Sequence, residues 1–362
     1  MEKLIPFFSI DLAKITNHRS GEIKFGEKML TVHKDAKDIA TFLTNCPARY
    51  VLFGIPEDIG VRANFGRPGA ASAWESAIRS IANIQFNKFC KGNELLVLGQ
   101  LNVSEEMAAV EHLDYHNIAD RQKFNDLVVK IDKEVAHIVS TIVKAGKIPI
   151  IIGGGHNNSY GNIKGAALAK GKPINAINFD AHSDFRILEG RHSGNGFSYA
   201  FEEGFLHKYF IFGLHENYTS KKVLTKIKKI YSRVRYNTYD EIAIRKQKGF
   251  DAEMQNAHNF IKDEPYGIEI DLDALPNIAS SAMTISGFSV EQARQFVHYF
   301  GKNQNASYLH ICEGAPDLGE EKNNHLIGKL MGYLITDFMK ANDPTDGIIR
   351  AMEVDFTEIK ST

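Results

Sequence analysis

The chain has 362 residues, of which 43% are hydrophobic and 24% are charged, and its net charge is −1. This near-neutral balance, without a long basic stripe, argues against a nucleic-acid partner, and no apolar run is as long as a membrane span. The lack of such a run also means that we expect no membrane partner. Because no linker rich in Pro and Ser divides the sequence, we expect one domain over residues 1–362.

Short apolar runs alternate with amphipathic segments along the chain. The apolar runs are continuous, which is typical of strands buried on both faces of a parallel sheet, and they cover residues 50–55, 94–98, 148–152, 176–180, 209–213, 267–271 and 308–311. Apolar residues at i, i+3 and i+4 predict helices between them, most clearly at about 121–145, 289–301 and 326–338. The basic segment 221–229 is expected to be a solvated helix face. This order predicts an α/β fold of three layers, with helices on both faces of a mostly parallel central sheet.

The cysteines indicate a reducing environment. Cys46, Cys90 and Cys312 cannot all pair with one another and show no C-x-x-C spacing. This favours a cytoplasmic protein over a disulfide framework. The apolar run at residues 4–8 is too short for a signal peptide and lacks a basic segment before it.

Three of the predicted strands end in side chains that can bind a metal. The motif Asp-Ala-His-Ser-Asp at 180–184 places three such side chains at alternate positions, so on an extended segment they converge on one point. Gly-Gly-Gly-His at 153–156 and Asp-Leu-Asp at 271–273 follow two other strands, and the glycine run lacks the Lys-Ser/Thr ending of a phosphate loop. Carboxylates and imidazoles suit Mn²⁺, and six ligands with shared carboxylates fit a pair of ions. The candidate ligands are His156, Asp180, His182, Asp184, Asp271 and Asp273.

These motifs resemble those of the ureohydrolases, the family of arginase, agmatinase and formimidoylglutamase, which read G-G-[DG]-H, D-A-H-x-D and S-x-D-x-D-x-x-D-P. The similarity covers roughly residues 49–340, which leaves 1–48 as an N-terminal extension and 341–362 as a tail. Residues 54–70 resemble the family's first strand and the loop beside its substrate cleft, and Glu313 begins an E-x-x-P element. The resemblance implies an arginase-like fold, two Mn²⁺ ions per subunit, a small amino-acid substrate and a homo-oligomer.

The ligand set predicts a hydrolase, and the resemblance to the ureohydrolases implies that it cleaves a linear C–N bond. Two Mn²⁺ ions would lower the pKa of a shared water, and the hydroxide would add to a planar carbon that carries two or three nitrogens. By resemblance to the family, Asp184 would relay a proton to the leaving amine, and Glu313 would bind the cationic amidinium or guanidinium group of the substrate.

The chain departs from the family pattern around the third motif. Glu269 stands where the family usually has Ser, Pro276-Asn277 replaces Asp-Pro, and residues 278–285 replace A-P-G-x-G-x-P. None of these changes removes a predicted ligand, but together they alter the neighbouring loop.

The loop after Asp184 bears on the choice of substrate. Ser193-Gly194-Asn195 resembles the arginase segment S-G-N-x-H-G, whose Ser and Asn contact the amino-acid end of the substrate and whose His shuttles protons. The position of that His is Phe197 here, so His192 would have to replace it. These features favour arginine as the substrate, with Ser193 and Asn195 binding it.

Other residues favour formimidoylglutamate. Gly155, Arg186 and Phe197 resemble the formimidoylglutamase motifs G-G-G-H, D-A-H-x-D-x-R and S-G-x-x-F. A guanidinium can bind a carboxylate through two hydrogen bonds, so Arg186 suits a substrate with a second carboxylate; alternatively, it is a surface Arg paired with Glu189. We predict a formimidoylglutamate hydrolase, with arginase as the alternative. A non-catalytic metal-binding scaffold is the remote third hypothesis, and six intact ligand positions argue against it.

Overall fold

The computed structural model describes residues 3–36, 38–319 and 324–343. Within these residues the strands form one ten-stranded sheet in the order β1-β4-β3-β5-β10-β9-β6-β7-β8, with β2 paired to β4. All of the pairings are parallel except that of β1 with β4. The strands are β1 (Leu4–Pro6), β2 (Leu30–Thr31), β3 (Tyr50–Gly54), β4 (Leu95–Leu101), β5 (Ile148–Ile152), β6 (Ile174–Phe179), β7 (Leu206–Leu214), β8 (Val234–Thr238), β9 (Tyr266–Asp271) and β10 (Ala306–Cys312).

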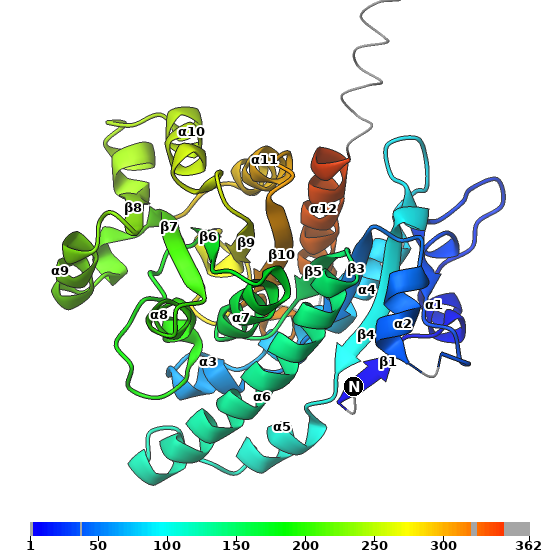
Figure 1. Cartoon of the computed structure of the whole chain (residues 1–362), viewed down its shortest axis with the longest axis horizontal. Helices are drawn as coiled ribbons and strands as arrows, with labels where there is room; N and C mark the ends of the chain where they lie inside the picture. Colours follow the sequence, from blue (N-terminus) through cyan, green and yellow to red (C-terminus); the bar gives the residue numbers. More distant parts are fainter. Residues whose placement is uncertain (1–2, 37, 320–323, 344–362) are drawn as a thin grey trace, which may run out of the picture.

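Helices cover both faces of this sheet, which confirms the predicted three-layer α/β fold (Figure 1). One apolar core contains side chains of α4, α10, α11 and α12, and the other contains side chains of α6, α7 and α8. The helices are α1 (Ser9–Ile15), α2 (Ile39–Asn45), α3 (Ile59–Ala63), α4 (Ala73–Ala82), α5 (Ser104–Val110), α6 (Ile118–Lys144), α7 (Asn158–Lys170), α8 (Gly196–Glu202), α9 (Lys221–Lys229), α10 (Phe250–Ile261), α11 (Val290–Gly301) and α12 (Asn324–Asn342).

The seven predicted strands all form, within a few residues of their predicted ends. Three strands were not predicted: β1 and β2, which are very short, and β8, whose residues Val-Arg-Tyr-Asn-Thr are too polar to read as a buried strand. Because β1 and β2 both pair with β4, the N-terminal extension is part of the sheet. Residues 344–362 of the predicted tail lie outside the described residues.

The centre of the sheet places four strand ends side by side. Strands β5, β10, β9 and β6 are neighbours in that order and run parallel, so their carboxyl ends meet at one edge. In open α/β sheets this edge is where ligands bind. All six predicted metal ligands and Glu313 lie at this edge: Asp271 is the last residue of β9, and the others lie in the segments that follow the four strands.

Two further expectations concern the chain as a whole. Within residues 3–36, 38–319 and 324–343, no helix combines the length and the apolar character that crossing a bilayer requires. Cys46, Cys90 and Cys312 are free thiols, and Cys46 and Cys312 are buried. The sequence likewise predicted no disulfide framework.

Candidate metal centre and substrate cleft

His156 is carried by a tight loop between β5 and α7. Gly153 and Gly154 have φ values of 86° and 72°, which side chains rarely permit. A Cβ atom on Gly154 would lie 2.2 Å from the Asn158 side chain. The buried Glu57 accepts hydrogen bonds from the backbone of Gly155 and from the Asn158 amide. The loop therefore closes over its own polar supports and directs His156 into the protein, where its side chain is fully buried.

The first group of candidate ligands surrounds Nδ1 of His156. This atom lies 2.8 Å from Asp184 Oδ2, 3.2 Å from Asp271 Oδ2 and 3.3 Å from Asp180 Oδ2. One ligand atom from each of these four residues lies within 4.8 Å of every other. They come from the ends of β5, β6 and β9, as the sequence predicts.

A second group consists of His182, Asp271 and Asp273, whose ligand atoms also lie within 4.8 Å of one another. Asp271 belongs to both groups, and Asp180 reaches both histidines because its Oδ1 lies 3.5 Å from His182 Nδ1. Asp273 accepts hydrogen bonds from the hydroxyl of Ser281 and the backbone of Ala282. The altered loop 278–285 thus supports a carboxylate of this second group.

The electrostatics of the two groups call for cations. Burial, then the charges of Asp180 and Asp273, raise the pKa of Asp271 well above its usual range. Burial and Asp180 likewise raise the pKa of Asp184. Burial would lower the pKa of His182, but Asp180 raises it well above the usual value. Several buried carboxylates at such short distances are stable only when positive charge balances them. Two imidazoles and four carboxylates, one of them shared between the groups, therefore fit a pair of divalent ions such as Mn²⁺.

Glu313 lies beside the metal groups with half of its carboxylate free. Its Oε1 accepts a 2.6 Å hydrogen bond from the backbone N–H of His156, and its buried Oε2 has no hydrogen-bond partner among the described residues. Burial and the charge of Asp273 raise the pKa of Glu313 to about 8. Glu313 and Asp184 have φ values of 61° and 44°, a strained conformation that is common at functional sites.

A cleft of about 1190 Å³ opens above these groups. Its buried acidic lining residues, Asp184, Asp271, Asp273 and Glu313, form what we call the acidic floor. Other lining residues come from the loop after α3, from the loop after β6 beyond Asp184 and from the region of α9, and most of the charged residues here are basic. We call its cations the basic rim; they are Arg67, Arg186, Lys221, Lys222, Lys226 and Lys229. The predicted solvated helix face of α9 is therefore also one wall of the cleft.

Besides Glu313, two of the predicted substrate-binding side chains, Arg186 and Ser193, line this cleft. Arg186 donates to Glu189 at 2.7 Å and to Asn64 Oδ1 at 3.2 Å, and 48% of its side chain is exposed. The Ser193 hydroxyl accepts a 3.1 Å hydrogen bond from Asn64 Nδ2. Both predicted roles of Arg186 thus have a geometric basis, since it pairs with Glu189 and also lines the cleft.

The other residues of this loop point elsewhere. The fully buried Asn195 is not among the cleft-lining residues; its Oδ1 accepts from Arg191 and its Nδ2 donates to the Gly190 carbonyl. Burial, then the charge of Arg186, lower the pKa of His192 to about 4. Phe197 stacks on Tyr209 at 4.2 Å between ring centroids and meets the edge of His156 at 5.1 Å. This geometry does not favour the predicted contact of Asn195 with substrate or His192 as a proton shuttle.

Sequence reasoning missed several residues of the site. Asn64 joins Arg186 to Ser193, although it lies within a segment that already resembled the cleft border. Tyr218 stacks on the ring of His182 at 5.4 Å and lines the cleft, but no motif marked it. His310, which packs near His156, resembled an ordinary strand residue.

Comparison with known proteins agrees with this geometry. Relatives named formimidoylglutamase include that of Aromatoleum aromaticum, which is 28% identical over 185 residues, 50% of this chain and 49% of the relative. Another, from Streptococcus pyogenes, is 30% identical over 178 residues, 46% of this chain and 47% of the relative. The matched segment thus spans about half the length of these relatives.

Solved structures are similar over a longer range. Formiminoglutamase of Trypanosoma cruzi, solved with Mn²⁺, has a TM-score of 0.68 and 18% identity, covering 88% of this chain and 98% of its own. Formimidoylglutamase of Bacillus subtilis has a TM-score of 0.70 and 19% identity, covering 90% and 94%. At this identity the likeness shows a common fold. The sequence profile of the arginase family matches residues 48–336. This chain belongs to the arginase family.

Proposed function

We propose that the protein is a dimanganese hydrolase that converts formimidoylglutamate and water to glutamate and formamide. The observation that carries this proposal is the separation of charge in the cleft, with an acidic floor and a basic rim. Formimidoylglutamate has a cationic amidinium at one end and two carboxylates at the other, which matches this polarity. The names of the relatives and of the similar structures agree with the choice.

The same polarity disfavours arginine. Arginine carries an α-ammonium group beside its carboxylate, and this group needs an acceptor at the rim of the cleft. Among the described residues that line the cleft outside the acidic floor, Glu189 alone is acidic, and it is already paired with Arg186. Asn195, which would bind the amino-acid end of arginine, is turned inward.

We assign the metal ligands from the two groups of side chains. His156, Asp180, Asp184 and Asp271 would hold one ion, and His182, Asp271 and Asp273, together with Asp180, the other. Bound Mn²⁺ would supply Lewis acidity and a water activated near neutral pH.

The protein side chains would orient the substrate and move its proton. The free Oε2 of Glu313 would accept hydrogen bonds from the amidinium and hold its carbon over the acidic floor. Water adds to this carbon, and the bond from the carbon to the glutamate nitrogen breaks. Asp184, which lines the cleft, would take a proton from the attacking water and pass it to that leaving nitrogen. Arg186 and Ser193 would face the carboxylates.

We also propose that the chain folds as one domain. The sheet takes its strands from Leu4 to Cys312, and the site uses residues that lie between Asn64 and Glu313. A division of the chain between Asn64 and Glu313 would separate residues that share the cleft, and a division before Asn64 would separate strands of one sheet.

The test is a paired assay of the Mn²⁺-loaded protein, which measures formamide from formimidoylglutamate and urea from arginine. We expect kcat/KM for formimidoylglutamate to be at least 100 times kcat/KM for arginine. Faster release of urea would replace the proposal with the arginase alternative, and no turnover of either substrate by protein with two bound Mn²⁺ would contradict both.

A further inference from the structure

His156 has two different surroundings on its two ring nitrogens. Nδ1 faces the three aspartates of the first metal group. Nε2 is buried and has no hydrogen-bond partner among the described residues, although the carboxylate of Glu269 lies only 3.5 Å away. A buried N–H without an acceptor costs about 1–3 kcal/mol. If Nε2 carries a proton, it therefore needs an acceptor, and the Glu269 carboxylate is close enough to become one.

Glu269 is held behind His156 by two residues of the neighbouring strand. His310 is its register partner across β9 and β10. His310 Nδ1 lies 2.5 Å from Glu269 Oε2, and the hydroxyl of Tyr308 donates to Glu269 Oε1 at 2.7 Å. All three side chains are fully buried. A carboxylate that is buried in this way is stable because its charge and its hydrogen bonds are both satisfied.

His310 also braces the loop that carries His156. Its second ring nitrogen, Nε2, lies 3.2 Å from the carbonyl of Gly153. A carbonyl can only accept, so Nε2 carries a proton and donates it. One imidazole thus joins the carboxylate behind His156 to the start of the His156 loop.

The strands make room for this arrangement at one position. A Cβ atom on residue 267 would lie 2.1 Å from Cζ of Tyr308, so only Gly allows the Tyr308 ring to reach Glu269. The usual family residue at position 269 is Ser, which is too short to reach either His156 or His310. Glu269, Tyr308 and His310 therefore form one hydrogen-bonded unit.

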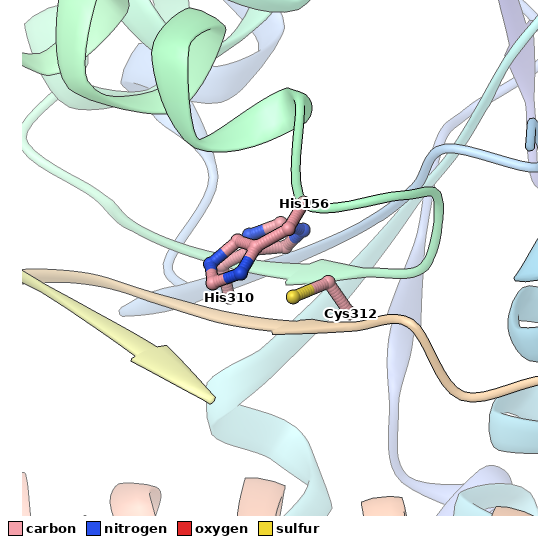
Figure 2. A group of neighbouring side chains, drawn as sticks. All are labelled: His156, His310 and Cys312. Carbon is pink, nitrogen blue, oxygen red and sulfur yellow. The ribbon is translucent and has the colours of Figure 1, made fainter. Parts of the chain in front are cut away.

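A third metal ion is not the better explanation of this cluster. Figure 2 shows that the rings of His156 and His310 lie next to each other with the Cys312 thiol close by, a grouping that could hold an ion. However, both nitrogens of His310 already have partners, and the Cys312 thiol contacts the Ile270 carbonyl at 3.6 Å. Two of the three side chains that an ion would need, those of His310 and Cys312, are therefore already engaged.

We infer that Glu269, held by His310, is a positioning residue that accepts the Nε2–H of His156 and so keeps Nδ1 free to bind Mn²⁺. This inference rests on the proposed metal site and adds to it a determinant of metal affinity. Outer carboxylate partners of metal-binding histidines fix the tautomer and the ring orientation, and their loss typically costs 10- to 100-fold in affinity.

The experiment compares Mn²⁺ affinity, measured by calorimetry, between the metal-free wild-type protein and Glu269→Gln. Gln preserves the size of the side chain and removes its charge. We expect the affinity of one of the two ions to fall 10- to 100-fold, and Glu269→Asp to lie between wild type and Gln. Glu269→Asp also serves as the readout if the Gln variant does not fold.

Two controls separate positioning from general loosening of the core. Tyr308→Phe removes a hydrogen bond from the same carboxylate but leaves the carboxylate facing His156, so it should lower the melting temperature and change Mn²⁺ affinity less than threefold. In a His156→Ala background only the second metal group is complete, and there Glu269→Gln should change the affinity of the remaining ion less than threefold.

The outcomes distinguish this inference from the proposed function. If the wild-type protein takes up no Mn²⁺, the proposed metal centre itself is wrong. If it binds two ions and Glu269→Gln binds them equally well, or if Tyr308→Phe weakens binding as much, only the positioning role is overturned. The same holds if Glu269→Gln still weakens binding tenfold when His156 is absent.

Discussion

Replacing Glu313 with Gln tests how the cleft recognises its substrate. The two side chains have the same shape, so the carbonyl oxygen of Gln can still accept the hydrogen bond from the His156 backbone that Glu313 accepts at 2.6 Å. What the variant loses is the negative charge of the free Oε2. We expect both Mn²⁺ ions to remain bound, because Glu313 belongs to neither group of metal ligands.

The size of the effect follows from the contacts of this oxygen. A hydrogen bond between charged groups contributes about 1.5–3 kcal/mol, and a free carboxylate oxygen can accept one or two from an amidinium. The loss should therefore be about 2–4 kcal/mol, which lowers kcat/KM roughly 30- to 1000-fold.

The same variant should stabilise the metal-free protein at alkaline pH. Burial and Asp273 raise the pKa of Glu313 from 4.5 to about 8. Between these pH values the folded protein holds a proton that the unfolded chain has released, so the stability of the metal-free fold decreases as the pH rises through this window. Gln does not ionise. Metal-free Glu313→Gln should melt above wild type at pH 8, and the difference should shrink toward pH 4.5.

The measurements are kcat/KM with formimidoylglutamate, bound Mn²⁺ per chain, and melting curves in a chelator at both pH values. Opposite signs are expected, with lower activity and higher metal-free stability at pH 8. An unchanged kcat/KM in protein that retains both ions would refute the role of Glu313. A variant that melts below wild type at pH 8 would refute the electrostatic reasoning.

Three further predictions follow from the other residues of the site. His182→Ala should reduce bound Mn²⁺ from two ions to one, and Asp271→Ala should reduce it further because it removes a ligand of both groups. Metal analysis after gel filtration measures the bound ions. Two bound ions per chain in Asp271→Ala would contradict the assignment. Arg186→Ala should lower kcat/KM for formimidoylglutamate roughly 5- to 30-fold, which corresponds to about 1–2 kcal/mol. This is less than for a buried pair because 48% of the Arg186 side chain is exposed, and Arg186→Lys should restore part of the activity. An unchanged kcat/KM would show that Arg186 acts only as a partner of Glu189. Burial and Arg186 lower the pKa of His192 from 6.5 to about 4, so the stability that depends on neutral His192 should be present above pH 6.5 and lost as the pH falls toward 4. The melting temperature of a His192→Gln variant should therefore fall less over this pH range than that of the wild type. Equal falls in melting temperature for the two proteins would exclude the effect.

The strands and the metal ligands were predictable because each depends on spacing within one segment. Continuous apolar runs of four to six residues indicated buried strands, and seven of them form. Along an extended backbone alternate side chains point the same way, so Asp180, His182 and Asp184 had to converge. The short or polar strands β1, β2 and β8 have no such pattern, since they form by pairing with strands already in place.

The surroundings of the ligands depended on the tertiary structure. Asn64 meets Arg186 across 122 positions of sequence, and His310 meets Glu269 across 41. Asn195 has the expected spacing, yet its side chain is directed into the protein by Arg191 and Gly190. The order of the strands decides which loops are neighbours, and competition among nearby donors and acceptors decides which way each polar side chain turns. Local sequence therefore determined which residues can bind metal, whereas the packing of distant segments decided which groups support them and which charges face the substrate.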